Sequence, residues 1–125
     1  MILYHGSPVG GLQILEPKFD PRLGIEGIFV SDEPFGPMMF SLLPESAKAD
    51  VDYQTKDGEF ISGTVQAPSF NKTGFLYTVE VPKDSIQSLQ SGELFLSEPA
   101  SIQGKRSVSE EEVVRLGWKM EKVLS

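Results

Sequence analysis

Short apolar runs, each bounded by glycine or proline, constrain the fold of this chain more than any other feature of its sequence. The clearest runs occupy residues 2–4, 27–31, 59–67, 74–81 and 93–97. They are rich in β-branched and aromatic side chains and too short for typical helices, which favours strands. The pattern predicts five to seven short strands with few helices, and therefore an α+β domain with a mostly antiparallel or mixed sheet.

Outside these runs, the chain predicts one short helix and several turns. The helix is expected over residues 35–43, with Asp32 as its N-cap. We expect a single helical turn at residues 86–89 and a basic turn at residues 104–106. Residues 45–58 are polar and carry no clear signal.

The last helix is the best specified. Ser109 precedes Glu112 by three residues, which forms a capping box. Three glutamates open the segment and lysines lie near its end, as the helix dipole favours. An apolar stripe at helical spacing extends the expected helix to the end of the chain and would pack on the sheet: Val113, Leu116, Met120 and Leu124.

Composition excludes several kinds of site. The 125 residues suit one domain, which we place over residues 1–125. There is no cysteine and one histidine, so disulfides, thiolate nucleophiles, Cys-rich zinc sites and multi-His metal sites are excluded. A net charge of −7 disfavours a broad nucleic-acid-binding face. No run is long enough for a membrane span, and the start lacks a signal peptide's features, so we expect a cytoplasmic protein.

The opening stretch carries the most chemistry. The first apolar run ends in His5, Gly6 and Ser7. An imidazole, a backbone without Cβ and a hydroxyl can hold a polar ligand close to the main chain. The same residues also suit an ordinary turn, so the stretch needs support from elsewhere. Neither nucleotide cradle, G-x-G-x-x-G or the P-loop, is present, and there is no G-x-S-x-G.

Three motifs resemble those of the ADP-ribosyltransferase superfamily. They are Tyr-His-Gly-Ser at residues 4–7, Gly-Ile-Phe-Val-Ser at 27–31 and Glu-Leu-Phe-Leu at 93–96. Their order matches the diphtheria-toxin-like branch, which includes the poly(ADP-ribose) polymerases, and the chain is similar to a small bacterial or phage-type member. The resemblance implies a split, mostly antiparallel sheet with NAD+ bound in a cleft. It covers roughly residues 1–43 and 92–103.

The resemblance implies a role for each matching residue. His5 would hold the adenosine ribose and belong to the catalytic set with Glu93, the catalytic carboxylate. The Gly6 backbone would hold the nicotinamide amide, and Ser7 would touch the adenosine ribose. The remaining cofactor-binding residues are Gly27 and two rings that would stack on nicotinamide, Phe29 and Phe40.

The chain departs from the family pattern at residues 29, 37 and 40. Phe29 and Phe40 stand in place of tyrosines, which keeps the rings but loses the hydroxyls. Pro37 stands where the family often has a serine that bonds the nicotinamide amide. Glu98 lies close to Glu93 and is the alternative carboxylate, although we favour Glu93.

The resemblance implies an enzyme that uses NAD+ as a substrate and needs no metal. It would be a mono-ADP-ribosyltransferase, acting as a toxin or effector on a macromolecular acceptor, more plausibly protein than nucleic acid, or an NAD+ glycohydrolase. One alternative is a degenerate module that binds NAD+ or ADP-ribose without chemistry. The other is an RNA 2′-phosphotransferase, for which the only obvious phosphate contacts are Arg22, Lys105 and Arg106.

Overall fold

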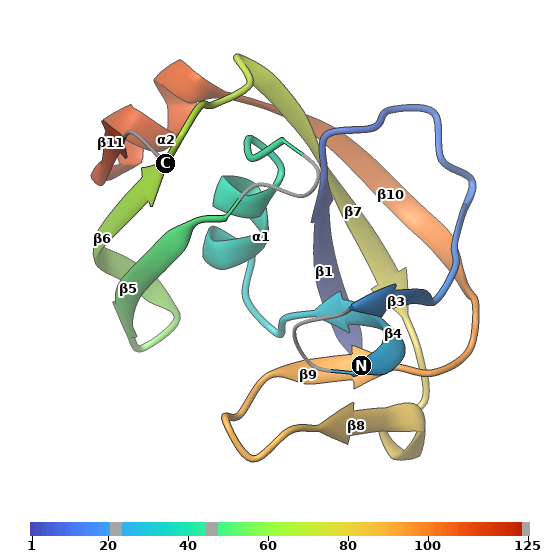
Figure 1. Cartoon of the computed structure of the whole chain (residues 1–125). Coiled ribbons are helices and arrows are strands. Elements are labelled where there is room, and N and C mark those ends of the chain that lie inside the picture. The colour runs from blue at the N-terminus through green and yellow to red at the C-terminus, as the bar shows by residue number, and fades with distance from the viewer. Residues whose placement is uncertain (21–23, 45–47, 124–125) are drawn as a thin grey trace.

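Three small β-sheets and two α-helices make up the described part of the chain (Figure 1). The computed structural model describes residues 1–20, 24–44 and 48–123. All strand pairs but one are antiparallel in that part of the chain, which confirms the α+β class and the mostly antiparallel sheets. It contains eleven strands, more than the sequence predicted.

The central sheet has the order β1-β7-β10-β2. Its strands are β1 (Ile2–Ser7), β7 (Thr73–Glu80), β10 (Ala100–Ser109) and β2 (Ile14–Leu15). The basic turn expected at residues 104–106 is wrong, because these residues pair with β7 inside β10. An irregularity in the pairing between Ile102 and Gly104 accommodates the glycine without ending the strand.

A second sheet, of order β3-β4-β9-β8, lies near the N-terminus of β1 (Figure 1). Its strands are β3 (Lys18–Asp20), β4 (Ile25–Val30), β9 (Leu94–Leu96) and β8 (Ile86–Ser88). The helical turn expected at residues 86–89 is wrong. A single 3₁₀ turn, η1 (Lys83–Ser85), precedes this position, and the apolar residues behind it pair with β9.

The third sheet has the order β11-β6-β5. Its strands are β11 (Trp118–Lys122), β6 (Glu59–Ala67) and β5 (Asp50–Lys56). The β6 bounds agree with the sequence prediction. Strand β5 falls in the polar segment that carried no clear signal, and β11 lies parallel to β6.

Helix α1 (Phe35–Phe40) is shorter than expected and begins differently. Pro34, not Asp32, is the N-cap residue, and it offers no side-chain cap. A Glu33 carboxylate oxygen instead accepts the backbone N–H of Phe35 at 2.6 Å. The acidic residue that satisfies the helix start is therefore one position later than the sequence suggested.

Helix α2 (Glu110–Leu116) begins as predicted, because the Ser109 Oγ accepts the N–H of Glu112 at 3.1 Å. It ends at Gly117, whose φ of 128° favours glycine. The expected continuation of the helix is wrong, since the chain leaves as strand β11. Leu124, the last residue of the expected stripe, lies outside the described residues.

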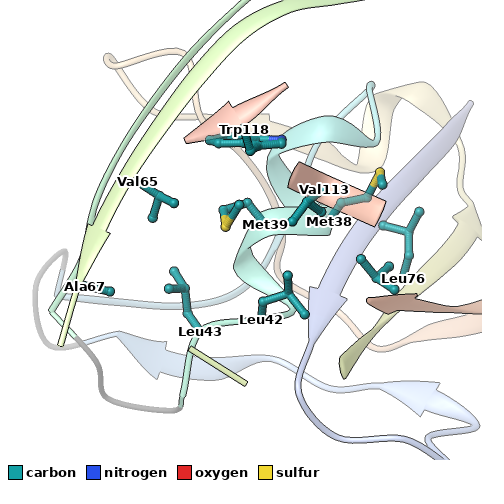
Figure 2. Packing of buried hydrophobic residues seen from close by; sticks show 10 residues of the cluster. Met38, Met39, Leu42, Leu43, Val65, Ala67, Leu76, Val113 and Trp118 are labelled. Carbon is teal, nitrogen blue, oxygen red and sulfur yellow. The ribbon is translucent and has the colours of Figure 1, made fainter. Parts of the chain in front are cut away.

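Two separate hydrophobic cores hold these elements together. The helix-side core, drawn in Figure 2, comprises Met38, Met39, Leu42, Leu43, Val65, Ala67, Leu76, Val108, Val113 and Trp118. The strand-side core comprises Leu3, Leu15, Ile28, Val30, Tyr77, Val79, Leu96 and Ala100. Strand β7 belongs to both cores, because its successive side chains point to opposite faces of the central sheet.

Helix α1 packs against the face of β1 that carries Gly6. A Cβ added to Gly6 would lie 1.8 Å from the Pro37 carbonyl oxygen, so only glycine allows this approach. Across the described residues, we find no helix with the length and apolar character needed to cross a membrane.

Candidate functional site

Strands β1 and β4 meet once and then separate. The backbone of Tyr4 exchanges two hydrogen bonds with that of Ser31, at 2.8 and 3.0 Å. Towards Gly6 and Phe29 no further backbone bond joins the two strands in the described part of the chain. We call this place, defined by Tyr4, Gly6, Phe29 and Ser31, the fork.

The fork leaves the backbone of Gly6 on an open edge of β1. In an antiparallel strand the N–H and C=O of one residue point to one edge, and those of the residue two positions on point to the same edge. Because Tyr4 bonds towards β4, the N–H and C=O of Gly6 also point towards β4. The helix contact with Pro37 covers the face of Gly6 rather than this edge.

His5 closes the fork from the side of β1. Its Nδ1 lies 2.7 Å from the carbonyl oxygen of Phe29. A carbonyl can only accept, so Nδ1 carries the hydrogen and Nε2 is left as an acceptor. Burial lowers the pKa of His5; the bond to Phe29 opposes this shift, and the positive charge of Lys18 adds to it. The imidazole is therefore neutral at pH 7, with one lone pair to offer.

Two phenylalanine rings pack against each other on one face of β4 and β9, beside the fork. Phe29 and Phe95 are directly paired residues on β4 and β9, and their ring centroids are 6.2 Å apart. Gly27 lies on the same face, where a Cβ would stand 3.0 Å from the Phe95 ring. Its lack of a side chain leaves room for that ring, which is a packing reason for this glycine.

Glu93 comes immediately before β9. Val30 pairs with Leu94, so Glu93 falls near the level of Ser31, across β4 from the edge that faces β1. Its side chain is exposed, and its backbone oxygen accepts the N–H of Leu89 at 2.8 Å. Glu98 follows the other end of β9, two residues after Leu96.

The two remaining predicted residues lie on either side of Gly6. The Ser7 Oγ is buried and accepts the N–H of Val9 at 3.1 Å, so it shapes the following loop. Phe40 is 50% exposed at the end of α1. It is adjacent to Ser41, whose backbone N would lie 3.0 Å from a Cβ on Gly6, so its ring comes from the helix end that covers this glycine.

A hydrogen-bonded group centred on the Glu33 carboxylate, which the sequence did not reveal, adjoins the fork at Ser31. One Glu33 oxygen accepts both the Ser31 hydroxyl, at 2.9 Å, and the Tyr53 hydroxyl. Burial, followed by the hydrogen bond to Glu33, raises the pKa of Tyr53, which keeps this donor protonated. Ser31 was predicted to end a strand, but nothing in the sequence connected residues 31 and 33 to a tyrosine in the polar segment.

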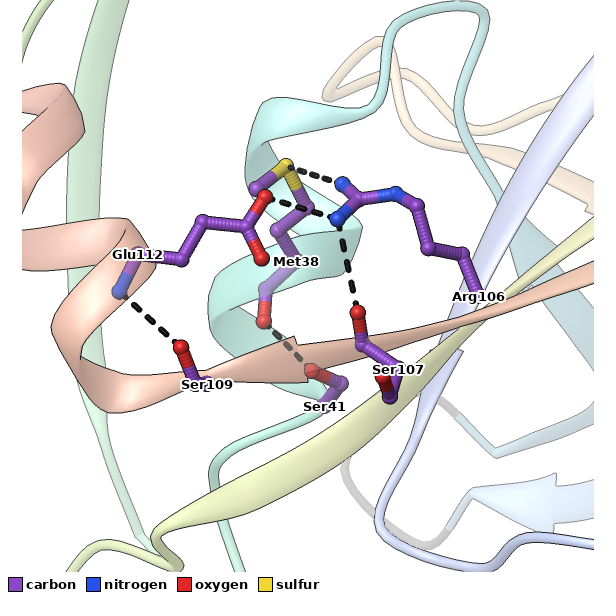
Figure 3. A network of polar contacts seen from close by, with 6 residues as sticks. All are labelled: Met38, Ser41, Arg106, Ser107, Ser109 and Glu112. Carbon is purple, nitrogen blue, oxygen red and sulfur yellow. Dashed lines mark hydrogen bonds and ion pairs between the residues drawn. The ribbon is translucent and has the colours of Figure 1, made fainter.

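Two of the three basic residues considered for an RNA substrate make contacts of their own. Arg106 pairs with Glu112 at 2.7 Å and also contacts the Met38 sulfur at 3.7 Å (Figure 3). The Lys105 Nζ lies over the Phe75 ring, 5.6 Å from its centroid. Arg22 lies outside the described residues.

The cavities identified lie beside α2 rather than at the fork. One of about 280 Å³ is lined by Met38, Glu112, Arg115 and Leu116. Within residues 1–20, 24–44 and 48–123, no group of three or more His, Asp or Glu side chains could hold a metal ion. The groups around the fork are the backbone N–H and C=O of Gly6, the Phe29 and Phe95 rings and the His5 imidazole, and Glu93 precedes the neighbouring strand β9. Together they could bind a flat, polar organic ligand.

Comparison of the chain with protein-family models, with curated proteins and with solved structures found no match in any of the three.

Proposed function

We propose that this chain is an NAD+-dependent mono-ADP-ribosyltransferase, or an NAD+ glycohydrolase when water is the acceptor. In this proposal the three sheets correspond to an ADP-ribosyltransferase-like split sheet, and NAD+ is bound as a substrate at the fork. The motif order in the sequence and the proximity of their strands support the assignment. His5 and Gly6 come from β1, Phe29 from β4, and Glu93 from the residue before β9.

The observation that carries the proposal is the open edge at Gly6. A primary carboxamide presents one acceptor oxygen and two N–H donors in a plane. The N–H and C=O of Gly6, pointing to the same edge, complement such a group with two hydrogen bonds. Nicotinamide bears this carboxamide on a flat ring, for which Phe29 and Phe40 supply stacking faces.

Glu93 supplies the chemical step. The bond between C1′ of the ribose and the nicotinamide nitrogen breaks, and nicotinamide leaves with the electron pair. The ribose then carries oxocarbenium charge, which the Glu93 carboxylate stabilises. A nucleophilic oxygen or nitrogen of the acceptor forms the new bond to C1′ and gives its proton to Glu93.

His5 orients the other half of the ligand. With Nδ1 held by Phe29, the neutral Nε2 accepts a hydrogen bond from a ribose hydroxyl. This contact is made equally in the ground state and in the transition state, so it contributes mainly to binding.

A protein side chain in the cytoplasm is the proposed acceptor. The chain's net charge of −7 would repel a nucleic-acid acceptor, and Arg106 is already paired with Glu112.

The test is nicotinamide release from NAD+ by the purified chain. Glu93→Gln should lower the rate about 100-fold or more while leaving ligand binding nearly unchanged. Glu98→Gln, the same change beyond the other end of β9, is the matched control and should retain full activity. Full release by Glu93→Gln, or loss of release only in Glu98→Gln, would refute the assignment of Glu93.

A second candidate function is a binding module of the same fold without chemistry. Two observations favour it: the phenyl ring at Phe29 lacks a hydroxyl, and no donor among the described residues bonds the Glu93 carboxylate. NAD+ or ADP-ribose would then raise the melting temperature by mass action without releasing nicotinamide. The same assay, run with thermal unfolding, separates the two functions.

A further inference from the structure

The edge of β4 that faces β1 changes partner along its length. Residues 25–27 pair with β3, Phe29 accepts the His5 ring, and Ser31 pairs with Tyr4. Strand β3 therefore lies next to the imidazole, although it is separated from β1 by several residues of chain. Any side chain on the correct face of β3 can reach a ligand held by His5.

Lys18 is that side chain. It is directly paired with Gly27, and paired residues point to the same face of a sheet. Gly27 and Phe29 share a face because they are two positions apart, so Lys18 lies on the side of the Phe29 and Phe95 rings. Its positive charge is close enough to lower the pKa of His5, which independently places it near the imidazole.

The charge on Lys18 is available to a ligand. Lys18 is exposed, and the ion pairs between described residues do not include it. Asp20, two positions along β3, makes an interaction of its own. On a chain of net charge −7, an unpaired cation beside the candidate site is the feature that would attract an anionic ligand.

The site is thereby polarised along β4. Lys18 marks the level of Gly27, and Glu93 marks the level of Ser31. The two levels are four residue steps apart along β4, about 13 Å, and Phe29 lies midway between them. Such a length accommodates a ribose at the carboxylate end and the phosphates attached to it at the cationic end.

We propose that Lys18 binds the diphosphate of the nucleotide ligand, an inference that rests on the proposed function and names a subsite of the same site. A lysine ammonium acts on phosphates as a compact point charge and needs no fixed geometry, which suits its exposed position. The diphosphate lies between the ribose held by His5 and the ribose that faces Glu93. Lys18 thus selects nucleotides carrying phosphates over nucleosides.

Calorimetric titration with ADP-ribose and, separately, with adenosine tests this assignment. Lys18→Gln should weaken ADP-ribose binding about tenfold, weaken its dependence on salt, and leave adenosine binding unchanged. Lys18→Arg should restore most of the ADP-ribose affinity, because it restores the charge. Lys105→Gln, which removes the same charge from an exposed position over Phe75, is the matched control and should bind as the unmodified chain does.

The outcomes separate the subsite from the chemistry. Equal ADP-ribose affinity in Lys18→Gln and the unmodified chain, or no binding of ADP-ribose by the unmodified chain, overturns the role of Lys18. Binding that depends on Lys18 without any nicotinamide release supports the subsite and refutes the enzyme. Nicotinamide release by Lys18→Gln with an unchanged KM for NAD+ supports the enzyme and refutes the Lys18 subsite.

Discussion

The two cores each contain one large buried aromatic residue, and they differ in whether its polar atom has a hydrogen-bond partner. In the strand-side core, the Tyr77 hydroxyl donates to the Val9 carbonyl at 2.6 Å and accepts the Leu12 N–H at 3.3 Å. In the helix-side core, the Trp118 indole N–H is buried without an acceptor among the described residues. Trp118 is instead held by neighbouring rings, with centroids 5.5 Å from Tyr53 and 5.3 Å from Phe60.

The difference shows what each core does for the fork. In the strand-side core, the Tyr77 hydroxyl fixes the loop that follows His5 and Gly6 by hydrogen bonds to its backbone. The helix-side core uses shape, and it presses α1 onto the face of Gly6 through Pro37. One core therefore positions backbone by hydrogen bonds, and the other limits the space available there.

The contact between Gly6 and Pro37 should show the largest effect of a single substitution. Gly6→Ala should destabilise the protein by about 3 kcal/mol, because its Cβ would meet a backbone oxygen that cannot move alone. Urea unfolding measures this change. Gly104→Ala is the matched control: the nearest atoms to its Cβ belong to Thr78, at 3.8 and 3.9 Å, so its effect should stay within about 0.5 kcal/mol. Equal stability of the two variants would mean that α1 does not press on β1.

A smaller effect should distinguish the two cores through their tyrosines. Tyr77→Phe leaves the Val9 carbonyl without its donor and should cost about 1–2 kcal/mol in thermal or urea unfolding. Tyr53→Phe should cost less, because Glu33 keeps the Ser31 hydroxyl and the Phe35 N–H. A larger loss of stability in Tyr53→Phe than in Tyr77→Phe would mean that the hydroxyl bonds matter more on the helix side than in the strand-side core.

The smallest effect is a pH dependence that only the strand side should show. Because burial lowers the pKa of His5 in the folded protein, the unfolded chain binds the proton more readily between the two pKa values. The stability contributed by neutral His5 is present above its unfolded pKa of 6.5 and is lost as the pH falls through the folded value. Urea unfolding at pH 7.5 and 5.5 should show this loss, and His5→Asn should reduce it. An identical pH dependence in that variant would exclude His5 as its source.

Strands β1, β4, β7 and β9 were predictable from the sequence, because each coincides with a short apolar run, whereas β8 was not. The bounds of β6 and the Ser109 cap of α2 were confirmed for the same kind of reason: local patterns determined them. The site residues could be named, but their proximity depends on sheet register. The role of the open Gly6 edge was inaccessible without the Tyr4–Ser31 pairing.

The errors come from residues whose partners are distant in the sequence. Lys105 and Arg106 look like a turn beside Gly104, yet β7 holds them in a strand. Met120 fits a helical stripe, but Gly117 ends the helix and β6 offers a strand partner. Strand β5 is polar because only alternate residues, such as Val51 and Tyr53, face the helix-side core. Tertiary pairing overrode local propensity in each case.

Strand β7 carries a consequence for how the chain acquires its structure during synthesis. Ile2 pairs with Glu80, so the first strand has no partner in the central sheet until the chain has grown to β7. Contacts of such high sequence separation form slowly, because a long loop must close first. Glu93 follows later still. A nascent chain can thus contain His5 and Gly6 long before β7 is available to pair with β1, and Glu93 is added only after β7.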